Sequence, residues 1–581
     1  MEFFKKSFLF KRDNKTFYVF SELLEIVRCK DYQDIEDSLV YIEKMVSLGY
    51  FAAGFVAYEA AKAFDPKFFV NQNEISDYLW FGIYKKVEIA DIESFCTDKK
   101  SGWNPDWKFP FSYKDYEKKI EFIKNKIKLG DIYQLNLTFL MSCFVQEPAF
   151  DIFVRHFAGL DSPYCGFVET DEFAVISSSP ELFFSLDKDI LTSKPMKGTI
   201  KRGINCKEDE INKKILSNSI KDQAENIMIL DMMRNDFSKI SEKLSVKADN
   251  IFEIEKYSRV FQMTSTVKCK TKASITEIFK ALFPCASITG APKFKAMEYI
   301  NELENSQRGV YTGAMGYLMP GRKSVFNVAI RTLYINKKKK LGFYGTGGGI
   351  VWDSKAKEEY DECMNKALVV SEPEPDFMLL ETMLYIPDSG FYLEKYHVKR
   401  ILESAKYFSF EFNLDKFSDF LKNFKSDKFL KVRVLAGKNR QLSFESFELL
   451  DNPLEKKIKW KVCLSNENIS SKNRFIYHKT TNRKIYEDTL SKYKKYNDVI
   501  LVNERNEITE SCYSNIVIQK NGCLYTPHSS SGLLPGTMRQ FLIDEKKLKE
   551  KIILKNELKD CEKIFLINSV RGFIEVELDI S

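Results

Sequence analysis

One lysine stands in a sequence setting that could make it a nucleophile. Lys197 lies in SKPMKGTIKRG, residues 193–203, where the preceding proline and the following Gly-Thr pair predict a tight turn with exposed backbone. Lys194, Lys201 and Arg202 crowd the same segment. Nearby cations and burial both lower the pKa of a lysine, and a neutral amine can attack carbon. The alternative interpretation is a surface loop whose charges all point into solvent.

Three carboxylates could take part in a site for a hard metal ion. Glu225 lies among apolar residues in the helix-like stretch KDQAENIMILDMMRNDF, residues 221–237. Glu359, Glu362 and Lys366 share one face of a second helical stretch, because they are spaced three and four residues apart. Mg²⁺ takes oxygen ligands and needs only one or two protein carboxylates. Spacing alone favours an ion-pair face over a metal site.

The composition is that of an ordinary globular protein. The 581 residues are 44% hydrophobic and 29% charged, with a net charge of +7, and the length predicts several domains or two large ones. Basic and acidic residues are interleaved, so a nucleic-acid surface is not expected. The four histidines exclude a histidine-rich metal centre.

Cysteine usage and hydropathy predict the compartment. The 12 cysteines contain no CxxC pair. The chain shows neither a signal-like start nor a run of about 20 apolar residues. We therefore expect reduced thiols and a cytoplasmic enzyme that associates with neither membrane nor nucleic acid.

Polar and proline-rich stretches predict the domain boundaries. SEPEPD, residues 371–376, is twice interrupted by proline and lies between two patterned regions, which is typical of a linker. A softer boundary falls within TDKKSGWNPDWKFP, residues 97–110. We expect an N-terminal part at 1–105, a catalytic domain at 106–370, the linker, and a second domain at 377–581.

The expected elements mix helix and strand. Helical patterns cover residues 34–49 and 113–130, the second with apolar residues at three- and four-residue steps. Successive strands are expected at 164–170, 172–179 and 182–187, and residues 327–335 are expected to pair with 340–348. These patterns predict a mixed α+β and α/β fold with much antiparallel sheet.

A series of motifs occurs in order along the first part of the chain. They read GDIYQLNLT, SSSPELFF, PMKGTIKRG, DQAENIMILDMMRND, FPCASITGAPKFKAMEYINELE, RGVYTGAMGY and GTGGGIVWDSKAKEEYDECMNKA. Together they resemble the chorismate-utilising enzymes, a family that includes anthranilate synthase component I, aminodeoxychorismate synthase component I and their isochorismate relatives. The resemblance implies a chorismate-binding two-sheet sandwich with flanking helices and the ligand between the layers.

The resemblance also implies a metal and a substrate site. In this family Mg²⁺ bridges the ring carboxylate of the substrate and two glutamates, which correspond here to Glu225 and Glu362. Arginine offers a planar fork suited to the other carboxylate of chorismate, and glycines let backbone N–H groups approach closely. The implied substrate-binding residues are Gly198, Thr199, Tyr311, Arg331, Gly347, Gly348, Gly349 and Lys366.

The residue at position 197 distinguishes the reactions within this family. Anthranilate synthases carry alanine there, whereas aminodeoxychorismate synthases carry lysine. Lys197 would add to C2 of chorismate as the C4 hydroxyl leaves, and ammonia would then attack C4 and expel the lysine. Glu181 occupies the general acid/base position of the family. Gln262 replaces a histidine found in many members, and glutamine cannot take up a proton at neutral pH.

A second series of motifs follows the linker: FMLLETMLY, LEKYHVKRILESAKYFSFEF, FIYHKTTNRKIYE, DVILVNERNEITESCYSNIVI and LYTPHSSSGLLPGTMRQFLI. They resemble the class IV aminotransferases, most closely 4-amino-4-deoxychorismate lyase. The resemblance implies a two-subdomain fold-type IV domain that carries pyridoxal 5′-phosphate on Lys479, with Glu510 against the pyridine nitrogen. The other residues that would hold the cofactor are Arg400, Asn515, Thr537 and Met538.

The two halves would catalyse consecutive reactions. The first would convert chorismate and ammonia into 4-amino-4-deoxychorismate, and the second would eliminate pyruvate to leave 4-aminobenzoate, a folate precursor. The sequence shows no glutaminase motif, so we expect free ammonia or a separate glutamine amidotransferase subunit as the nitrogen source. Class IV relatives also imply a homodimer.

Three alternatives stay open at this point. The first half could make anthranilate, which Lys197 argues against. The second half could be a D-amino-acid or branched-chain aminotransferase, because such an enzyme would share Lys479 and Glu510. It could also be a non-catalytic scaffold that docks the amidotransferase.

Overall fold

The computed structural model describes residues 7–13, 16–91, 103–158, 162–304, 306–371, 375–456 and 458–579. Part of the expected linker, residues 372–374, and part of the softer boundary, residues 97–102, lie outside these ranges.

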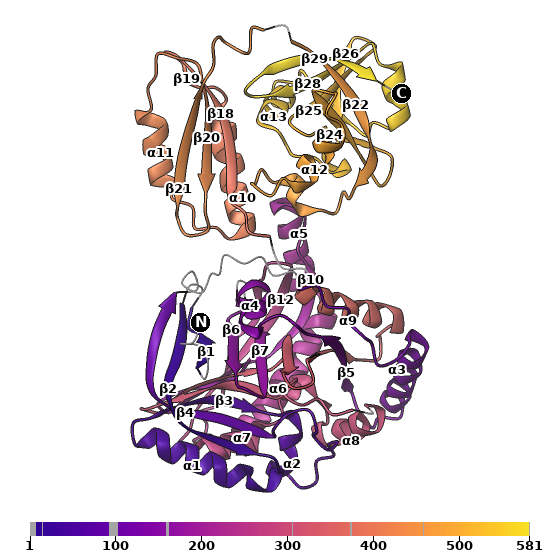
Figure 1. Cartoon of the computed structure of the whole chain (residues 1–581). Helices are drawn as coiled ribbons and strands as arrows, with labels where there is room; N and C mark the ends of the chain where they lie inside the picture. The colour runs from indigo at the N-terminus through magenta and orange to yellow at the C-terminus, as the bar shows by residue number, and fades with distance from the viewer. Residues whose placement is uncertain are drawn as a thin grey trace. The chain divides into compact units, whose positions relative to one another are not determined.

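The chain forms two compact units, whose elements are labelled in Figure 1. The first unit comprises Met1–Lys201 and Lys213–Glu374, and the second comprises Arg202–Asn212 and Pro375–Ser581. The short segment Arg202–Asn212 therefore belongs to the second unit, although its neighbours along the chain on both sides belong to the first.

Antiparallel strands build the first unit. Successive pairings give the order β13-β5-β17-β16-β7-β6-β1-β2-β4-β3-β14-β15-β8-β9-β12, and β10 and β11 also pair with β12. The strands are β1 (Phe8–Lys11), β2 (Thr16–Cys29), β3 (Phe51–Val56), β4 (Leu79–Asp91), β5 (Gln134–Phe144), β6 (Tyr164–Glu169), β7 (Phe173–Ser179), β8 (Leu182–Asp187), β9 (Ile190–Lys194), β10 (Met196–Lys201), β11 (Lys247–Lys256), β12 (Val260–Lys270), β13 (Gly290–Ala291), β14 (Ala314–Met319), β15 (Lys323–Val328), β16 (Thr332–Asn336) and β17 (Leu341–Ile350).

Two helices of the first unit, α3 and α7, begin with a capping box. At α3 the Ser112 hydroxyl accepts from the backbone of Asp115, whose carboxylate bonds back to Ser112. Ser274 and Glu277 form the same box at α7. The helices are α1 (Ile35–Ser47), α2 (Ala61–Phe64), α3 (Tyr113–Lys128), α4 (Ala149–Ile152), α6 (Ile220–Ser238), α7 (Ile275–Leu282), α8 (Lys293–Leu303) and α9 (Ala356–Ser371), and α5 (Cys206–Ser217) begins in the inserted segment.

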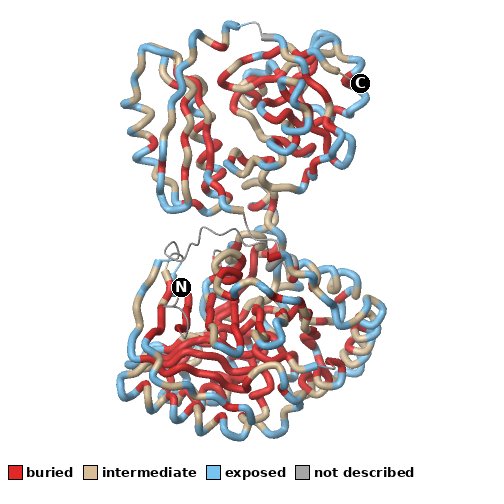
Figure 2. Tube along the Cα trace, in the orientation of Figure 1, coloured by how far each residue is buried: buried red, intermediate tan, exposed pale blue. Residues whose placement is uncertain are grey.

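The expectation of a mixed fold with antiparallel sheet is confirmed in this unit. The predicted helices at 34–49 and 113–130 correspond to α1 and α3, and the pairing of β16 with β17 was also predicted. Figure 2 shows the paired strands as buried stretches, while α1 keeps an exposed face. The finer description as a two-sheet sandwich stays a prediction.

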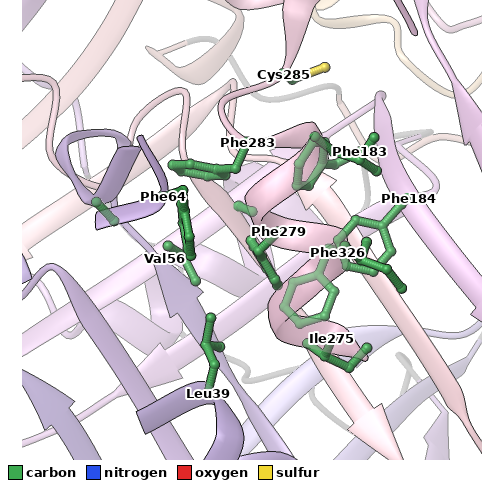
Figure 3. Packing of buried hydrophobic residues seen from close by; sticks show 14 of the residues in the cluster. Leu39, Val56, Phe64, Phe183, Phe184, Ile275, Phe279, Phe283, Cys285 and Phe326 are labelled. Atoms are coloured by element: carbon green, nitrogen blue, oxygen red, sulfur yellow. The ribbon is translucent and has the colours of Figure 1, made fainter. Parts of the chain in front are cut away.

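Phenylalanines form the centre of the largest apolar cluster in the first unit. The Phe279 ring on α7 lies 5.2 Å from the Phe326 ring, 5.4 Å from Phe184 and 6.0 Å from Phe183, measured between centroids. Figure 3 shows these rings around Phe279. Phe183 and Phe184 lie two and three residues after Glu181, on the strand that follows that carboxylate, so the cluster holds this strand in place.

Two sheets build the second unit. The smaller has the order β19-β18-β20-β21, and the larger the order β24-β23-β22-β29-β28-β25-β26-β27, with β24 also paired to β25. The strands are β18 (Leu379–Ile386), β19 (Gly390–Phe391), β20 (Leu430–Ala436), β21 (Leu442–Glu448), β22 (Ile458–Ile469), β23 (Asp498–Asn503), β24 (Ile508–Ser511), β25 (Asn515–Lys520), β26 (Cys523–Pro527), β27 (Lys549–Lys551), β28 (Lys563–Asn568) and β29 (Gly572–Asp579). The helices are α10 (Glu394–Phe408), α11 (Leu414–Asn423), α12 (Lys484–Lys492) and α13 (Thr537–Asp544).

The pairing of β24 with β25 closes a ring of six strands in the larger sheet, since β24, β23, β22, β29, β28 and β25 pair in turn. Closure leaves these strands no free edge. Across the described ranges, no helix combines the length and the apolar content needed to cross a membrane. The cysteines in the same ranges are free thiols, as expected.

We predict that Phe279→Ala lowers the free energy of unfolding of the first unit by about 3–5 kcal/mol, because it leaves a cavity among several buried rings. The matched control is Phe69→Ala, whose side chain is 45% exposed. The control is expected to cost less than about 1 kcal/mol. Urea unfolding followed by circular dichroism measures both values, and equal losses in the two variants would contradict the assignment of Phe279 to the core.

Candidate functional site

Lys197 lies on a bulged strand, and the tight turn predicted from its sequence is wrong. β10 pairs with β12, and the register shifts between Met196 and Thr199. Gly198 takes up the extra residue with a φ of 93°, a conformation that suits glycine. The Gly-Thr signal therefore marks a bulge, because bulges and turns both need a residue with positive φ.

Two amide side chains fix the backbone of this bulge. Asn226 Nδ2 on α6 donates to the carbonyl oxygen of Lys197 at 3.2 Å. Gln262 Nε2 donates to the carbonyl oxygen of Gly198 at 2.9 Å, and the Thr199 hydroxyl donates to Gln262 Oε1 at 2.8 Å. Gln262 thus orients Gly198 and Thr199. No sequence pattern singles out Asn226 beyond its place next to Glu225.

The tip of Lys197 reaches β17. A β-carbon at Gly349 would lie 2.6 Å from Nζ of Lys197 and 2.8 Å from Nε2 of Gln134, so only glycine leaves both side chains their space. Gln134, at the start of β5, is buried, and neither its amide nitrogen nor its amide oxygen has a hydrogen-bond partner among the described residues. A buried amide without a partner is costly, which fits a site that receives a polar ligand.

Burial lowers the pKa of Lys197 below its ordinary value. Glu225 and Glu181 oppose this by favouring the ammonium form, and Lys366 adds to it by repulsion. The cause is therefore mainly desolvation, which favours the neutral amine.

The expectation that Lys194 and Arg202 repel Lys197 is wrong. Lys194 Nζ pairs with Glu255 and lies 3.0 Å from Glu253 Oε2. Arg202 pairs with Asp209 in the second unit. Both cations are neutralised by carboxylates, so neither acts on the lysine.

Glu181 lies just before β8 with 3% of its surface exposed. Burial raises the pKa of its carboxyl group to about 7, against the opposing effects of the Ser287 hydroxyl and of Lys197. Its Oε1 has no hydrogen-bond partner among the described residues. A carboxyl group that gains and loses its proton near neutral pH suits general acid/base work.

Glu225 and Glu362 come from two helices and face the same region. Burial raises the pKa of Glu225, and the charge of Glu362 adds to this effect. The charge of Lys366 lowers the pKa of Glu362, and the Lys366 Nζ lies 2.8 Å from Glu362 Oε1. The same Nζ donates to the carbonyl oxygen of Gly347 at 2.8 Å. In the described ranges, no group of three or more His, Cys, Asp or Glu residues is arranged to hold a metal ion.

Groups suited to a carboxylate lie near the same end of β17. Burial lowers the pKa of Arg331, which forms no ion pair with a carboxylate among the residues described. Tyr311 packs so closely on Gly345 that a β-carbon there would lie 2.1 Å from its ring. From Gly345 to Ile350, β17 pairs with β5 but no longer with β16. Along this stretch, which includes Gly347, Gly348 and Gly349, every second backbone N–H therefore points to the side where β16 no longer pairs.

Lys479 in the second unit is held by the smaller sheet. Its carbonyl oxygen accepts from the backbone N–H of Leu380 on β18 at 3.0 Å. Burial lowers the pKa of its amine to about 7, Arg400 and Arg483 add to this, and Glu381 and Glu510 oppose it. The amine therefore loses its proton near neutral pH.

Glu510 lies on the closed strand ring. Its Oε1 accepts from the Tyr486 hydroxyl at 2.7 Å and its Oε2 from the Leu534 backbone N–H at 3.1 Å. Burial raises its pKa to about 7. Asn515 is its direct partner in the pairing of β24 with β25, and its Nδ2 donates to the carbonyl oxygen of Leu534 at 2.8 Å.

A buried arginine and a helix start lie in the same unit. Arg400 on α10 donates to both oxygens of Glu381, at 2.8 and 2.6 Å, and His397 Nδ1 lies 2.7 Å from the same carboxylate. The Thr537 hydroxyl lies 3.4 Å from His397 Nε2. Thr537 and Met538 open α13, where backbone N–H groups have no partner within the helix.

Family comparison decides what these two sites belong to. Residues 12–372, more than half of the chain, match the model of the chorismate binding enzymes. The chain belongs to this family. Residues 378–578 match the model of the class IV amino-transferases. The resemblance seen in the motifs is therefore confirmed in both halves.

The relatives of this chorismate binding enzyme carry the names of two different synthases. Aminodeoxychorismate synthase component 1 of Bacillus subtilis is 36% identical over 263 residues, which are 45% of this chain and 56% of that protein. Anthranilate synthase component 1 of Saccharomyces cerevisiae is 36% identical over 314 residues, 52% of this chain and 61% of that protein. The matches thus span little more than half of these relatives.

Solved structures show the shared fold. The crystal structure of anthranilate synthase component I from Streptococcus pneumoniae superposes with a TM-score of 0.55 and 24% identity, covering 62% of this chain and 92% of that one. This likeness concerns the fold of the first unit.

We predict that Gly349→Ala lowers the turnover of chorismate by about 10²-fold, because the new methyl group displaces the Lys197 amine and groups misplaced by about 1 Å react poorly. Gly437→Ala is the control, since a β-carbon there meets no atom closer than 3.4 Å. The melting temperature should stay close to that of the original protein in both variants. Full turnover in Gly349→Ala would show that the amine does not need this space.

Proposed function

We propose that the chain makes 4-aminobenzoate from chorismate in two consecutive reactions. The first unit adds ammonia to give 4-amino-4-deoxychorismate, and the second eliminates pyruvate from that product. The observation that carries the proposal is the half-buried Lys197, whose lowered pKa and position beside Gln134, Gly349 and Glu181 suit a nucleophile. The chain matches relatives named aminodeoxychorismate synthase and relatives named anthranilate synthase. Between these two reactions, Lys197 favours amination at C4 over anthranilate formation.

Lys197 and Glu181 share the work of the first reaction. The Lys197 amine forms a bond to C2, the two conjugated ring double bonds shift, and the C4–O bond breaks as Glu181 gives its proton to the departing hydroxyl, which leaves as water. The Glu181 carboxylate then takes the proton released at the lysine nitrogen. Ammonia bonds to C4, the double bonds shift back, and the C2–N bond breaks. Glu181 gives its proton to the leaving Lys197 nitrogen and takes one proton from the new ammonium group at C4. The balance is chorismate plus ammonia to aminodeoxychorismate plus water.

Glu225 and Glu362 fit a magnesium ion. They supply two hard oxygen ligands that face one region, and Mg²⁺ usually takes one or two carboxylates and fills its shell with water and substrate. A bound ion would neutralise the ring carboxylate of chorismate, and Lys366, which pairs with Glu362, would lie beside the substrate. Arg331, which lacks a carboxylate partner among the described residues, takes the other carboxylate with Tyr311 and the amides of Gly347, Gly348 and Gly349.

The second unit fits pyridoxal 5′-phosphate. Lys479 offers an amine whose pKa is near 7, and Glu510 offers a buried carboxylate fixed by two hydrogen bonds. The amides of Thr537 and Met538 at the start of α13, with Arg400, suit the phosphate. Asn515 braces the loop before α13 through Leu534.

The bound cofactor supplies an electron sink for eliminating pyruvate. Glu510 keeps a proton on the ring nitrogen, and the Nζ of Lys479 takes the proton from C4 of the substrate ring. Burial of both groups keeps water from the reacting carbon.

The nitrogen source is ammonia, delivered by a separate glutamine amidotransferase subunit. The matched Bacillus protein carries the designation component 1, which supports a partner of this kind.

Lys197→Ala tests the proposal. The variant should form aminodeoxychorismate from chorismate and ammonium roughly 10³-fold more slowly or not at all, because the nucleophile is gone. Lys194→Ala is the control, since Lys194 is held by Glu253 and Glu255 and should change the rate only slightly. Chromatography of the products is the measurement. Undiminished 4-amination in Lys197→Ala, or anthranilate as the main product of the original protein, would refute the proposal.

Capture of the cofactor by Lys479 should depend on pH. The rate of reconstitution with pyridoxal phosphate should rise as the pH increases through about 7, because below that value the amine carries a proton and cannot attack. Visible absorbance of the lysine-bound cofactor follows the reaction. Lys479→Ala should show no such band, and a rate that is flat from acid to alkaline pH would contradict the assignment.

A further inference from the structure

The segment Arg202–Asn212 is part of the second unit, although it follows directly after β10 in the chain. It includes the beginning of α5, drawn in magenta in Figure 1. Its sequence matches none of the motifs assigned to the class IV fold, all of which lie beyond the linker. What it does within the second unit is therefore open.

An internal ion pair shapes the segment. Arg202 Nε lies 2.8 and 2.9 Å from the two carboxylate oxygens of Asp209, and the Gly203 backbone N–H donates to Asp209 at 2.8 Å. The side chain of Arg202 is 5% exposed and that of Asp209 is 9% exposed. A buried bidentate pair of this kind fixes geometry as well as charge.

The segment contacts Tyr407 of α10 through both the backbone and the side chain of that residue. Arg202 Nη2 donates to the carbonyl oxygen of Tyr407 at 2.8 Å, and the Tyr407 hydroxyl donates to the carbonyl oxygen of Gly203 at 2.7 Å. The guanidinium carbon of Arg202 lies 4.6 Å from the centre of the Tyr407 ring. These contacts fix the ring in position and orientation.

Tyr407 in turn fixes the position of His478, the residue before Lys479. Its ring stacks on His478, with centroids 4.3 Å apart and planes 26° apart, and His478 directly precedes Lys479. The Ser404 hydroxyl lies 3.0 Å from His478 Nδ1. Burial lowers the pKa of His478 to about 3, so the ring stays neutral and acts as a flat packing surface.

A second line of contacts runs from the segment toward Glu510. Ile204 packs against an apolar cluster that contains Ile476, Tyr477 and Tyr486. The Tyr486 hydroxyl donates a hydrogen bond to Glu510. The segment therefore touches the supports of both cofactor-facing residues.

We propose that Arg202–Asn212 positions Lys479 and Glu510 for the second reaction, with Arg202 and Ile204 as its positioning residues. This inference rests on the proposed function of the second unit. It makes a stretch of chain from within the chorismate-binding sequence a working part of the pyridoxal-phosphate site.

Arg202→Gln and Ile204→Ala in the full-length chain test the proposal. Lys207→Gln is the matched control, because it removes a charge from an exposed side chain of the same segment. In the cofactor-free protein, the two test variants should increase deuterium uptake in peptides covering residues 474–486, and the control should not.

The second readout is the pH midpoint of cofactor capture. Arg400, Arg483, Glu381 and Glu510 are the charged groups that act on Lys479. They are unchanged in the variants, so looser packing should act by admitting water. Lost burial raises the pKa of a lysine, and the midpoint should move upward by about one unit. The control should keep the original midpoint.

Three results separate the outcomes. Original uptake and original midpoint in both variants would overturn the proposal, and so would increased uptake with an unchanged midpoint, since that assigns the segment to stability alone. Should Arg202→Gln fail to fold, the milder Ile204→Ala decides through the same two measurements. Absence of cofactor capture in the original protein would refute the proposed function instead, and the uptake experiment would still test the packing.

Discussion

Because Gly349 has no side chain, the amine of Lys197 can lie against the backbone of β17. Lys197 Nζ occupies the space that a β-carbon of Gly349 would need, and the amide of Gln134 shares it. β17 and β10 stand near opposite ends of the strand order, so the order must curl until its ends face each other before this contact can form. The site is thus a product of long-range strand pairing, and every antiparallel ladder between the two ends helps to set the distance between Lys197 and Gly349.

Desolvation does the same work in both units. Burial is the largest cause of the lowered pKa of Lys197 and Lys479 and of the raised pKa of Glu181 and Glu510. Each lysine also faces carboxylates that oppose the lowering of its pKa by favouring the ammonium form. In both units burial therefore lowers the pKa of a lysine and raises the pKa of a glutamate that acts on it, although the two folds differ in topology.

Local patterns predict much of the fold, whereas the residues at the sites are predicted by the resemblance of the motifs to known families. The helices α1 and α3 and the pairing of β16 with β17 follow from periodicity and turn residues that lie close together in the sequence. The bulge at Gly198 was taken for a turn, because one glycine signal serves both conformations. The pairing of Lys194 with Glu255 and the bracing by Asn226 depend on contacts between residues far apart in the sequence, whereas Arg202 pairs with Asp209, seven residues away. Gln134 stood inside a recognised motif, yet only its burial without a partner singles it out.

The membership of Arg202–Asn212 in the second unit bears on how such a protein could be divided. A gene fragment that starts at the polar stretch near residue 375 would encode every class IV motif but omit eleven residues of its packed neighbourhood. Recombination at that junction would therefore separate residues that fold together. Exchange of one half between homologous chains would require compatible residues at sites far apart in the coding sequence, which ties the evolution of the two halves to one another.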